Sequence, residues 1–97
     1  MGFFDVVHYS QKEHPLTEIE VKHHITYIAI PTLSGHPERE KLIQDMILAR
    51  RHSDGKISLQ QIYELLTHLK DTNAITKYDR EAVMPVLVTL FQQKGAV

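Results

Sequence analysis

The sequence predicts a mainly α-helical protein, a small single-domain bundle of four to five helices with at most a short β element. Three observations predict this fold class. Apolar residues recur at helical spacing over most of the chain after residue 16, two Ser/Thr capping boxes mark helix starts, and 97 residues is the size of one domain with a modest core. We therefore expect one domain over residues 1–97, with residues 1–15 as an N-terminal arm and residues 16–97 as the helical core.

The composition is that of a soluble globular protein, with 42% hydrophobic and 24% charged residues. The chain has no cysteine, which excludes disulfides, thiolate metal sites and cysteine nucleophiles and is typical of a reducing cytosol. The longest apolar stretches, residues 25–33 and 82–91, are much shorter than the roughly 20 residues that span a bilayer, and the first residues lack the basic region of a secretory signal. We expect a cytoplasmic protein with no membrane partner.

The first helix is expected to begin after Thr17, because Thr17 and Glu20 form a capping box and Leu16 can pack on Val21. The first ten residues fit neither a strand nor a helix well, so a short helix and an edge strand both stay open. Residues 25–30 are rich in β-branched side chains and either continue the helix or form a strand. Pro31 ends the element in both cases.

The second helix is expected from Pro37 to His52. Proline suits the first helical turn, and the acidic residues that follow it and the basic residues at the other end complement the helix dipole. Its apolar stripe consists of Leu42, Ile43, Met46, Ile47 and Leu48.

The third helix follows a turn at Asp54-Gly55 and a short extended Lys56-Ile57. Ser58 and Gln61 form the second capping box, with Ile57 placed to pack against Ile62. Apolar residues then continue at helical spacing to about residue 69, where a polar run closes the helix.

The last helix is expected to begin near Thr76 or Asp79 and to end at about Gln93, with Gly95 as its C-terminal cap. Pro85 lies within this span, so we expect a kink or a restart there. The helix is apolar nearly all round, which indicates either the centre of the core or a face covered by another subunit. The predicted partner or dimer interface consists of Val83, Val86, Leu87, Leu90 and Phe91.

Sites for metals and catalysis have little support in the sequence. The segment from Asp54 to Ser58 is similar to the middle of an EF-hand loop, but the flanking ligand positions hold Arg50, His52 and Gln61, which leaves one carboxylate where calcium needs several. No serine lies in a nucleophile elbow and the glycines are isolated, so no phosphate-binding loop is present. We expect a non-enzymatic protein with no metal site and no cofactor.

Residues 37–97 resemble a winged helix-turn-helix that stops where the wing would begin. The parts would be residues 37–52, Lys56-Ile57, residues 58–69, a recognition helix at residues 79–93, and residues 94–97. The resemblance implies a helix-turn-helix-like C-terminal part. The would-be recognition helix departs from the family because its middle is apolar and contains a proline, whereas a recognition helix needs polar side chains for base and phosphate contacts.

Two functions remain open. The first is a small protein-interaction module, an adaptor or accessory and regulatory protein that is expected to self-associate as a homodimer. The second is a DNA-associated regulator of winged-helix type, whose nucleic-acid contacts would be Arg50, Arg51, Lys56, Lys77 and Arg80. A formal net charge of −1 and acidic residues interspersed among these basic ones favour the protein partner over nucleic acid.

Overall fold

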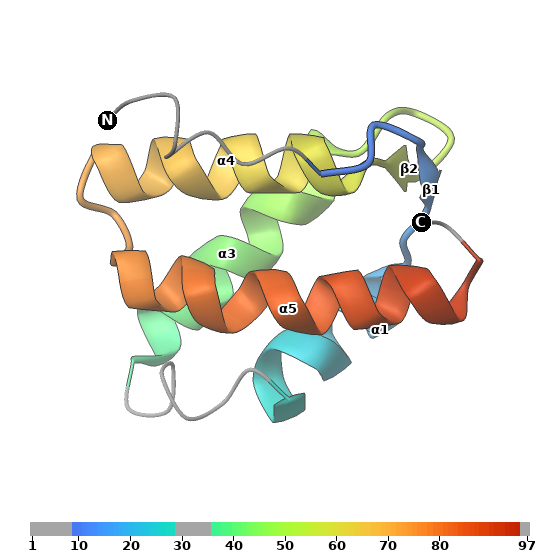
Figure 1. The fold of residues 1–97 in the computed structure, drawn as a ribbon. Helices are drawn as coiled ribbons and strands as arrows, with labels where there is room; N and C mark the ends of the chain where they lie inside the picture. Colours follow the sequence, from blue (N-terminus) through green and yellow to red (C-terminus); the bar gives the residue numbers. More distant parts are fainter. Residues whose placement is uncertain (1–8, 29–35, 96–97) are drawn as a thin grey trace.

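A computed structural model gives the structure of the protein and describes residues 9–28 and 36–95. The elements follow in the order β1 (His14–Pro15), α1 (Glu18–His23), η2 (His24–Ile28), α3 (Pro37–Arg50), β2 (Lys56–Ile57), α4 (Leu59–Asp71) and α5 (Lys77–Gln93). The prediction of a mainly α-helical fold with a short β element is confirmed for these residues (Figure 1).

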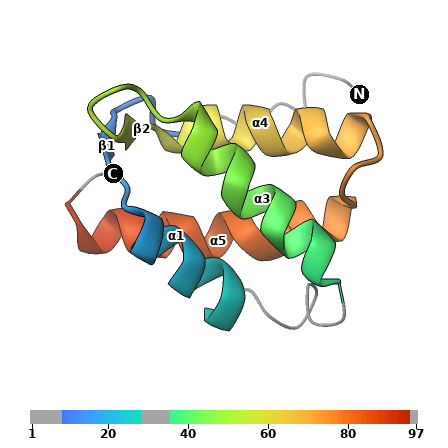
Figure 2. The same cartoon turned by 180° about the vertical axis from the view of Figure 1, so that it is seen from behind.

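The helices form two layers. Helices α4 and α5 lie side by side in the layer that faces the viewer in Figure 1. Helix α3 crosses both of them on the other side, where α1 also lies (Figure 2). The π-helix η2 continues α1 and contacts α5 and α3. This arrangement leaves one side of α5 without a covering helix in the described structure.

The core lies between the two layers, where the helices turn their apolar sides toward one another. It consists of Leu16, Val21, Ile25, Ile43, Ile47, Ile57, Leu59, Ile62, Leu66, Leu69, Ile75, Val83, Met84, Leu87, Leu90 and Phe91. The predicted stripe of α3 takes part as expected, with Ile43 and Ile47 fully buried and its other members partly buried against the core. Gln44 is buried as well, and its side-chain amide is satisfied by a hydrogen bond of 2.9 Å that it donates to Thr26 of η2.

Three capping boxes start α1, α4 and α5. The boxes at Thr17 and Ser58 confirm the sequence prediction, and a third at Thr76 fixes the start of α5. In each box the capping hydroxyl accepts a hydrogen bond from the third helical N–H, and the third side chain accepts one from the capping residue's own N–H. Gly95 has a φ of +72° directly after the last turn of α5, as expected of a C-terminal glycine cap.

Helix α5 runs through Pro85 without interruption, so the expected restart does not occur. Pro85 is exposed, and the carbonyl that loses its hydrogen bond belongs to Glu81, which is also exposed. Water can satisfy that carbonyl, which explains why the proline is tolerated at this position.

The N-terminal segment pairs with the turn between α3 and α4. Strand β1 runs antiparallel to β2, with His14 opposite Ile57. Before the strand, the backbone of Tyr9 and Ser10 exchanges hydrogen bonds with Gln60 at the start of α4. Residues 24–28 form the π-helix rather than a strand, while residues 1–8, 29–35 and 96–97 lie outside the described structure.

Candidate interaction surface

Four of the five predicted interface residues are used by the protein's own core. Val83, Leu87 and Phe91 are fully buried and Leu90 is 6% exposed. This placement corrects the interface prediction, because none of these four side chains can meet a partner unless the fold opens. Val86 differs from them, since it is only half-buried and lies at the edge of the buried face, where it packs against the core.

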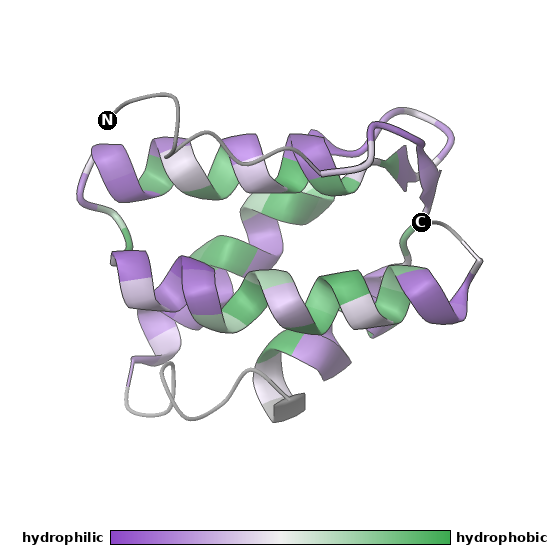
Figure 3. Ribbon diagram, viewed as in Figure 1, coloured by the Kyte–Doolittle hydropathy of each residue, from purple (hydrophilic) through white to green (hydrophobic). Residues whose placement is uncertain are grey.

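The solvent side of α5 carries a continuous uncharged stripe. Helical periodicity places Tyr78, Ala82, Pro85, Val86, Thr89 and Gln93 on one line along the helix. We call these six residues the outer stripe. Four of them are exposed and two, Ala82 and Val86, are half-buried. Residues 82–93 contain no charged residue at all, and Figure 3 shows α5 with hydrophilic ends and an apolar to neutral middle.

Two concave regions flank the outer stripe and meet at Pro85. One has a volume of about 270 Å³ and is lined by His24 of η2 together with Pro85, Val86, Thr89 and Gln93. The other has a volume of about 230 Å³ and is lined by Tyr9, Tyr63, Arg80, Glu81, Met84 and Pro85. The stripe is therefore a hollowed surface that can accept side chains from another molecule.

The second concave region, which we call the tyrosine–arginine pocket, is built from three elements. The rings of Tyr9 and Tyr63 lie 5.1 Å apart at 45°, and the Arg80 guanidinium lies 5.0 Å from the centre of the Tyr63 ring. Arg80 also donates a hydrogen bond of 2.9 Å to Thr67. Burial raises the pKa of Tyr9, and the nearby Tyr63 raises it further, against the opposing effect of Arg80. The cation is held between α4 and α5 by a stacking contact and one hydrogen bond.

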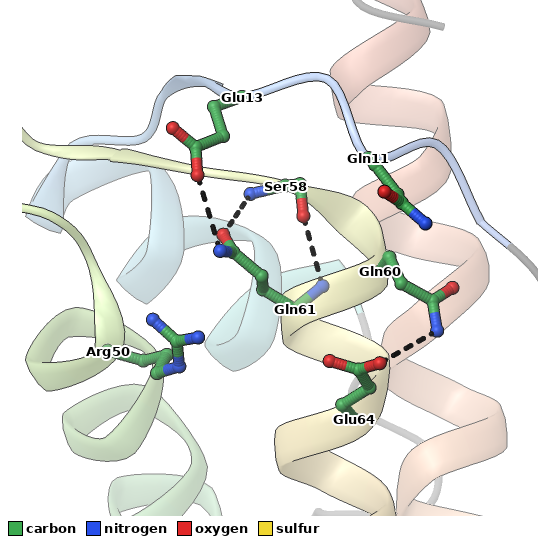
Figure 4. A pocket seen from close by; sticks show the side chains of 7 residues that line it. All are labelled: Gln11, Glu13, Arg50, Ser58, Gln60, Gln61 and Glu64. Atoms are coloured by element: carbon green, nitrogen blue, oxygen red, sulfur yellow. Dashed lines mark hydrogen bonds between the residues drawn. The ribbon is translucent and has the colours of Figure 1, made fainter.

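A third, polar pocket of about 350 Å³ lies beside the start of α4 (Figure 4). The side chains that line it mostly form hydrogen bonds with one another. Gln61 donates to Glu13 and completes the cap with Ser58, and Gln60 donates to Glu64. The Ser58 hydroxyl serves as the helix cap, so no activated nucleophile is present among these residues. The arrangement is that of hydrated surface polar groups around a capped helix end.

The turn that is similar to an EF-hand loop is closed by hydrogen bonds between protein groups. Gly55 adopts a φ of +81°, as the turn requires. His52 Nε2 and Gln61 Nε2 lie 2.6 Å and 3.2 Å from the same Glu13 carboxylate oxygen. A carboxylate from the N-terminal arm therefore occupies the point at which the two loop positions converge.

The basic residues predicted to contact nucleic acid do not gather in one place. Arg51 donates to the backbone carbonyls of Leu16 and Leu48, so its guanidinium has a structural role. Arg50 and Lys56 flank the turn before α4, whereas Lys77 and Arg80 lie in the first turn of α5, after the far end of α4. The 13 residues of α4 separate these two groups by about 20 Å of helix.

Among the described residues, no group of three or more His, Asp or Glu side chains is placed to hold a metal ion. No helix in the described part of the chain combines the length and the apolar character needed to cross a bilayer. Comparisons with protein-family models, with curated proteins and with solved structures give no match.

Sequence reasoning missed the tyrosine–arginine pocket. Tyr9 belongs to the arm, whose pattern indicates no regular element, and Tyr63 fits the apolar spacing of α4. The two tyrosines come together only in the folded structure, and no local sequence pattern predicts their contact. The uncharged run from residue 82 to 93 can be seen in the sequence. Which side of this helix faces solvent depends on how the helix packs, and the sequence does not show that.

Proposed function

We propose that this chain is a small non-enzymatic protein-interaction module, an adaptor or accessory protein, that self-associates through the outer stripe of α5. The observation that supports this proposal is the lack of charge along the stripe. A surface helix usually carries charged side chains on its solvent side. Charged residues are depleted at the centres of protein interfaces, where burying them would cost free energy.

The shape of the surface suits a second α-helix. The stripe extends from Tyr78 to Gln93, which corresponds to about 23 Å of helix. Ala82 and Thr89 are small enough to let a second helix approach closely, and the hollow between Pro85 and His24 accepts a larger side chain of the partner. In a twofold dimer the same stripe meets itself, so each copy supplies both the ridge and the hollow.

The DNA-binding alternative has less support from the geometry. Its five basic residues belong to two separate groups, and two of them, Arg51 and Arg80, already make structural contacts. Asp79, in the predicted recognition helix, is fully buried and pairs with Arg39. A binding face for phosphates needs several free cations on one surface, so the protein-binding function is retained as the proposal.

Sedimentation velocity over a range of protein concentrations tests the proposal. The wild-type chain is expected to form a dimer as the concentration rises, whereas Thr89→Glu stays monomeric because two carboxylates would be buried in the interface. Ile19→Glu is the matched control, since Ile19 is an apolar residue of α1 that is 80% exposed. A wild type that is monomeric at all concentrations, or a dimer that dissociates with Ile19→Glu and persists with Thr89→Glu, would contradict the proposal.

A further inference from the structure

We infer that the tyrosine–arginine pocket binds a protein segment in which an aromatic side chain is followed by a carboxylate. The aromatic ring fills the hollow lined by Tyr9, Tyr63 and Met84, and the carboxylate pairs with Arg80. This inference goes beyond self-association and rests on Tyr9, Tyr63 and Arg80, which lie beside the outer stripe; the pocket shares only Pro85 with the stripe.

The first argument is the state of Arg80. Its guanidinium is half-buried and fixed on two sides, by the Tyr63 ring and by the Thr67 hydroxyl. None of the carboxylates in the described part of the chain lies within ion-pair distance of it. Arg39, on the neighbouring α3, shows the contrast, because it pairs with Asp79 at 2.9 Å. A fixed arginine without an acidic partner is a ready site for a planar carboxylate.

The second argument is the lining and size of the pocket. Two tyrosine rings, a methionine and a proline provide flat and apolar walls, which suit an aromatic side chain. The volume of about 230 Å³ is below the roughly 300–1,000 Å³ of pockets that enclose whole small molecules. The pocket therefore fits a single anchoring side chain of a protein partner better than a complete cofactor.

The third argument is the direction of the two charges at the pocket. Arg80 points toward α4, where it bonds Thr67. Glu81 follows one position later, about 100° further around the helix, and is exposed at the rim. A bound segment can thus place its carboxylate on the α4 side and a backbone N–H on the Glu81 side. This polarity orients the segment across the pocket.

The test is a titration of the folded chain with short peptides, followed through the backbone amide resonances by NMR. The probes are acetyl-Ala-Phe-Asp-Ala-amide, its Phe-Asn counterpart, which removes only the charge, and its Ala-Asp counterpart, which removes only the ring. The protein variants are Arg80→Gln, Arg80→Lys as a second variant that keeps the charge, and Arg50→Gln as the control. Arg50 is exposed and has no ion-pair partner in the described structure.

The Phe-Asp peptide is expected to shift the amides of Tyr63, Arg80 and Met84 saturably, and to bind at least about fivefold more tightly than either counterpart, as a charge-assisted contact at a partly exposed site allows. Arg80→Gln removes this preference for Asp over Asn, Arg80→Lys weakens binding but keeps the preference, and Arg50→Gln changes neither. Equal binding of the Asp and Asn peptides, shifts located elsewhere, or unchanged binding by Arg80→Gln would overturn the inference. Those results would leave the sedimentation behaviour of Thr89→Glu untouched, so failure here is distinct from failure of the proposed self-association.

Discussion

Helices α4 and α5 are neighbours of similar burial, yet they distribute their charged groups differently along their lengths. Helix α4 turns Glu64, His68 and Asp71 toward solvent. Helix α5 instead directs charge inward near its ends, where buried Asp79 pairs with Arg39 and Lys94, just after the last turn, pairs with Glu20. Lys77 and Glu81 in its first turns are exposed, but its solvent side from residue 82 to residue 93 carries no charged residue.

This difference in charge distribution indicates which of the two helices is suited to remain exposed to solvent and which is suited to contact another protein. The outward charges of α4 keep its surface hydrated and discourage association. The inward-facing charges of α5 hold the helix against α3 and α1. The outer stripe therefore lies on a helix whose position is fixed by ion pairs at both ends. Lys94 Nζ lies 2.7 Å from Glu20 and also donates to the carbonyl of Pro15, which joins the C-terminal end of α5 to the start of α1.

The largest expected effect is a difference in the free energy of unfolding between a substitution on the buried side of α5 and one on its exposed side. Leu87 is fully buried, so Leu87→Glu places an unpaired charge in the core and should destabilise the fold by roughly 4 kcal/mol or more. Thr89→Glu, two residues further along, should change stability by no more than about 0.5 kcal/mol, because Thr89 is exposed. Urea unfolding followed by circular dichroism compares the two variants. Similar stability losses in both would show that the two sides of α5 have been assigned wrongly.

The next largest effect concerns the ion pair at the start of α5. Asp79 is fully buried and Arg39 Nε lies 2.9 Å from its Oδ2, although the N–H is not aligned with that oxygen and the directed hydrogen bond runs from Nη2 to Oδ1 at 3.4 Å. Arg39→Met leaves the carboxylate buried without its partner and should cost about 3 kcal/mol. Lys41→Met is the control on the same helix, since the Lys41–Asp45 pair is exposed and should contribute less than about 0.5 kcal/mol. Equal losses from the two variants in the same urea assay would contradict the structural role of Arg39.

A smaller effect with a characteristic pH dependence concerns the other end of α5. Burial by itself would raise the pKa of Glu20, but the hydrogen bonds from Lys94 and from the Thr17 backbone outweigh it and hold the pKa below its ordinary value of 4.5. A carboxyl with a lowered pKa in the folded state stabilises the fold above its unfolded pKa, and this stabilisation is lost as the pH falls through the folded pKa. Glu20→Gln, which can keep the capping box, should therefore lose about 1 kcal/mol at neutral pH.

The stability difference between the wild type and Glu20→Gln should shrink below pH 4.5 and vanish once the carboxyl is protonated in both states. Thermal unfolding of both chains across this pH range measures it. Glu18→Gln is the matched control for an exposed ion pair in the same turn. Glu18 pairs with Lys22, which lowers its pKa as well, but both side chains are more than half exposed, so its pH-dependent difference should be smaller than that of Glu20→Gln. A difference that is constant with pH would show that Glu20 does not act through its charge.

The local elements could be predicted from the sequence because their signals are local. Capping boxes at Thr17 and Ser58, the turn at Gly55 and the glycine cap at Gly95 each depend on a few neighbouring residues. A kink or a restart was expected at Pro85, and the restart does not occur. The cost of a proline depends on whether the freed carbonyl meets water, and exposure is a property of the packed structure.

The candidate surface was predicted only in part for a related reason. The sequence shows that residues 82–93 are uncharged and mostly apolar, but it does not show which side of the helix the rest of the chain covers. Packing of α5 against η2 and α4 buries Leu87 and Phe91 and leaves Pro85 and Thr89 outside. No sequence pattern predicts contacts between residues that are far apart in the chain, such as Tyr9 with Tyr63 or Arg39 with Asp79.

Cross-linking of single-cysteine variants tests the contrast between α4 and α5 most directly, since the natural chain contains no cysteine. Thr89→Cys places a thiol on the outer stripe and Glu64→Cys places one on the exposed side of α4. With a short bis-maleimide, Thr89→Cys should give a covalent dimer in a yield that rises with protein concentration, while Glu64→Cys should give little at any concentration. Equal yields from the two positions, or a higher yield from Glu64→Cys, would contradict self-association through α5.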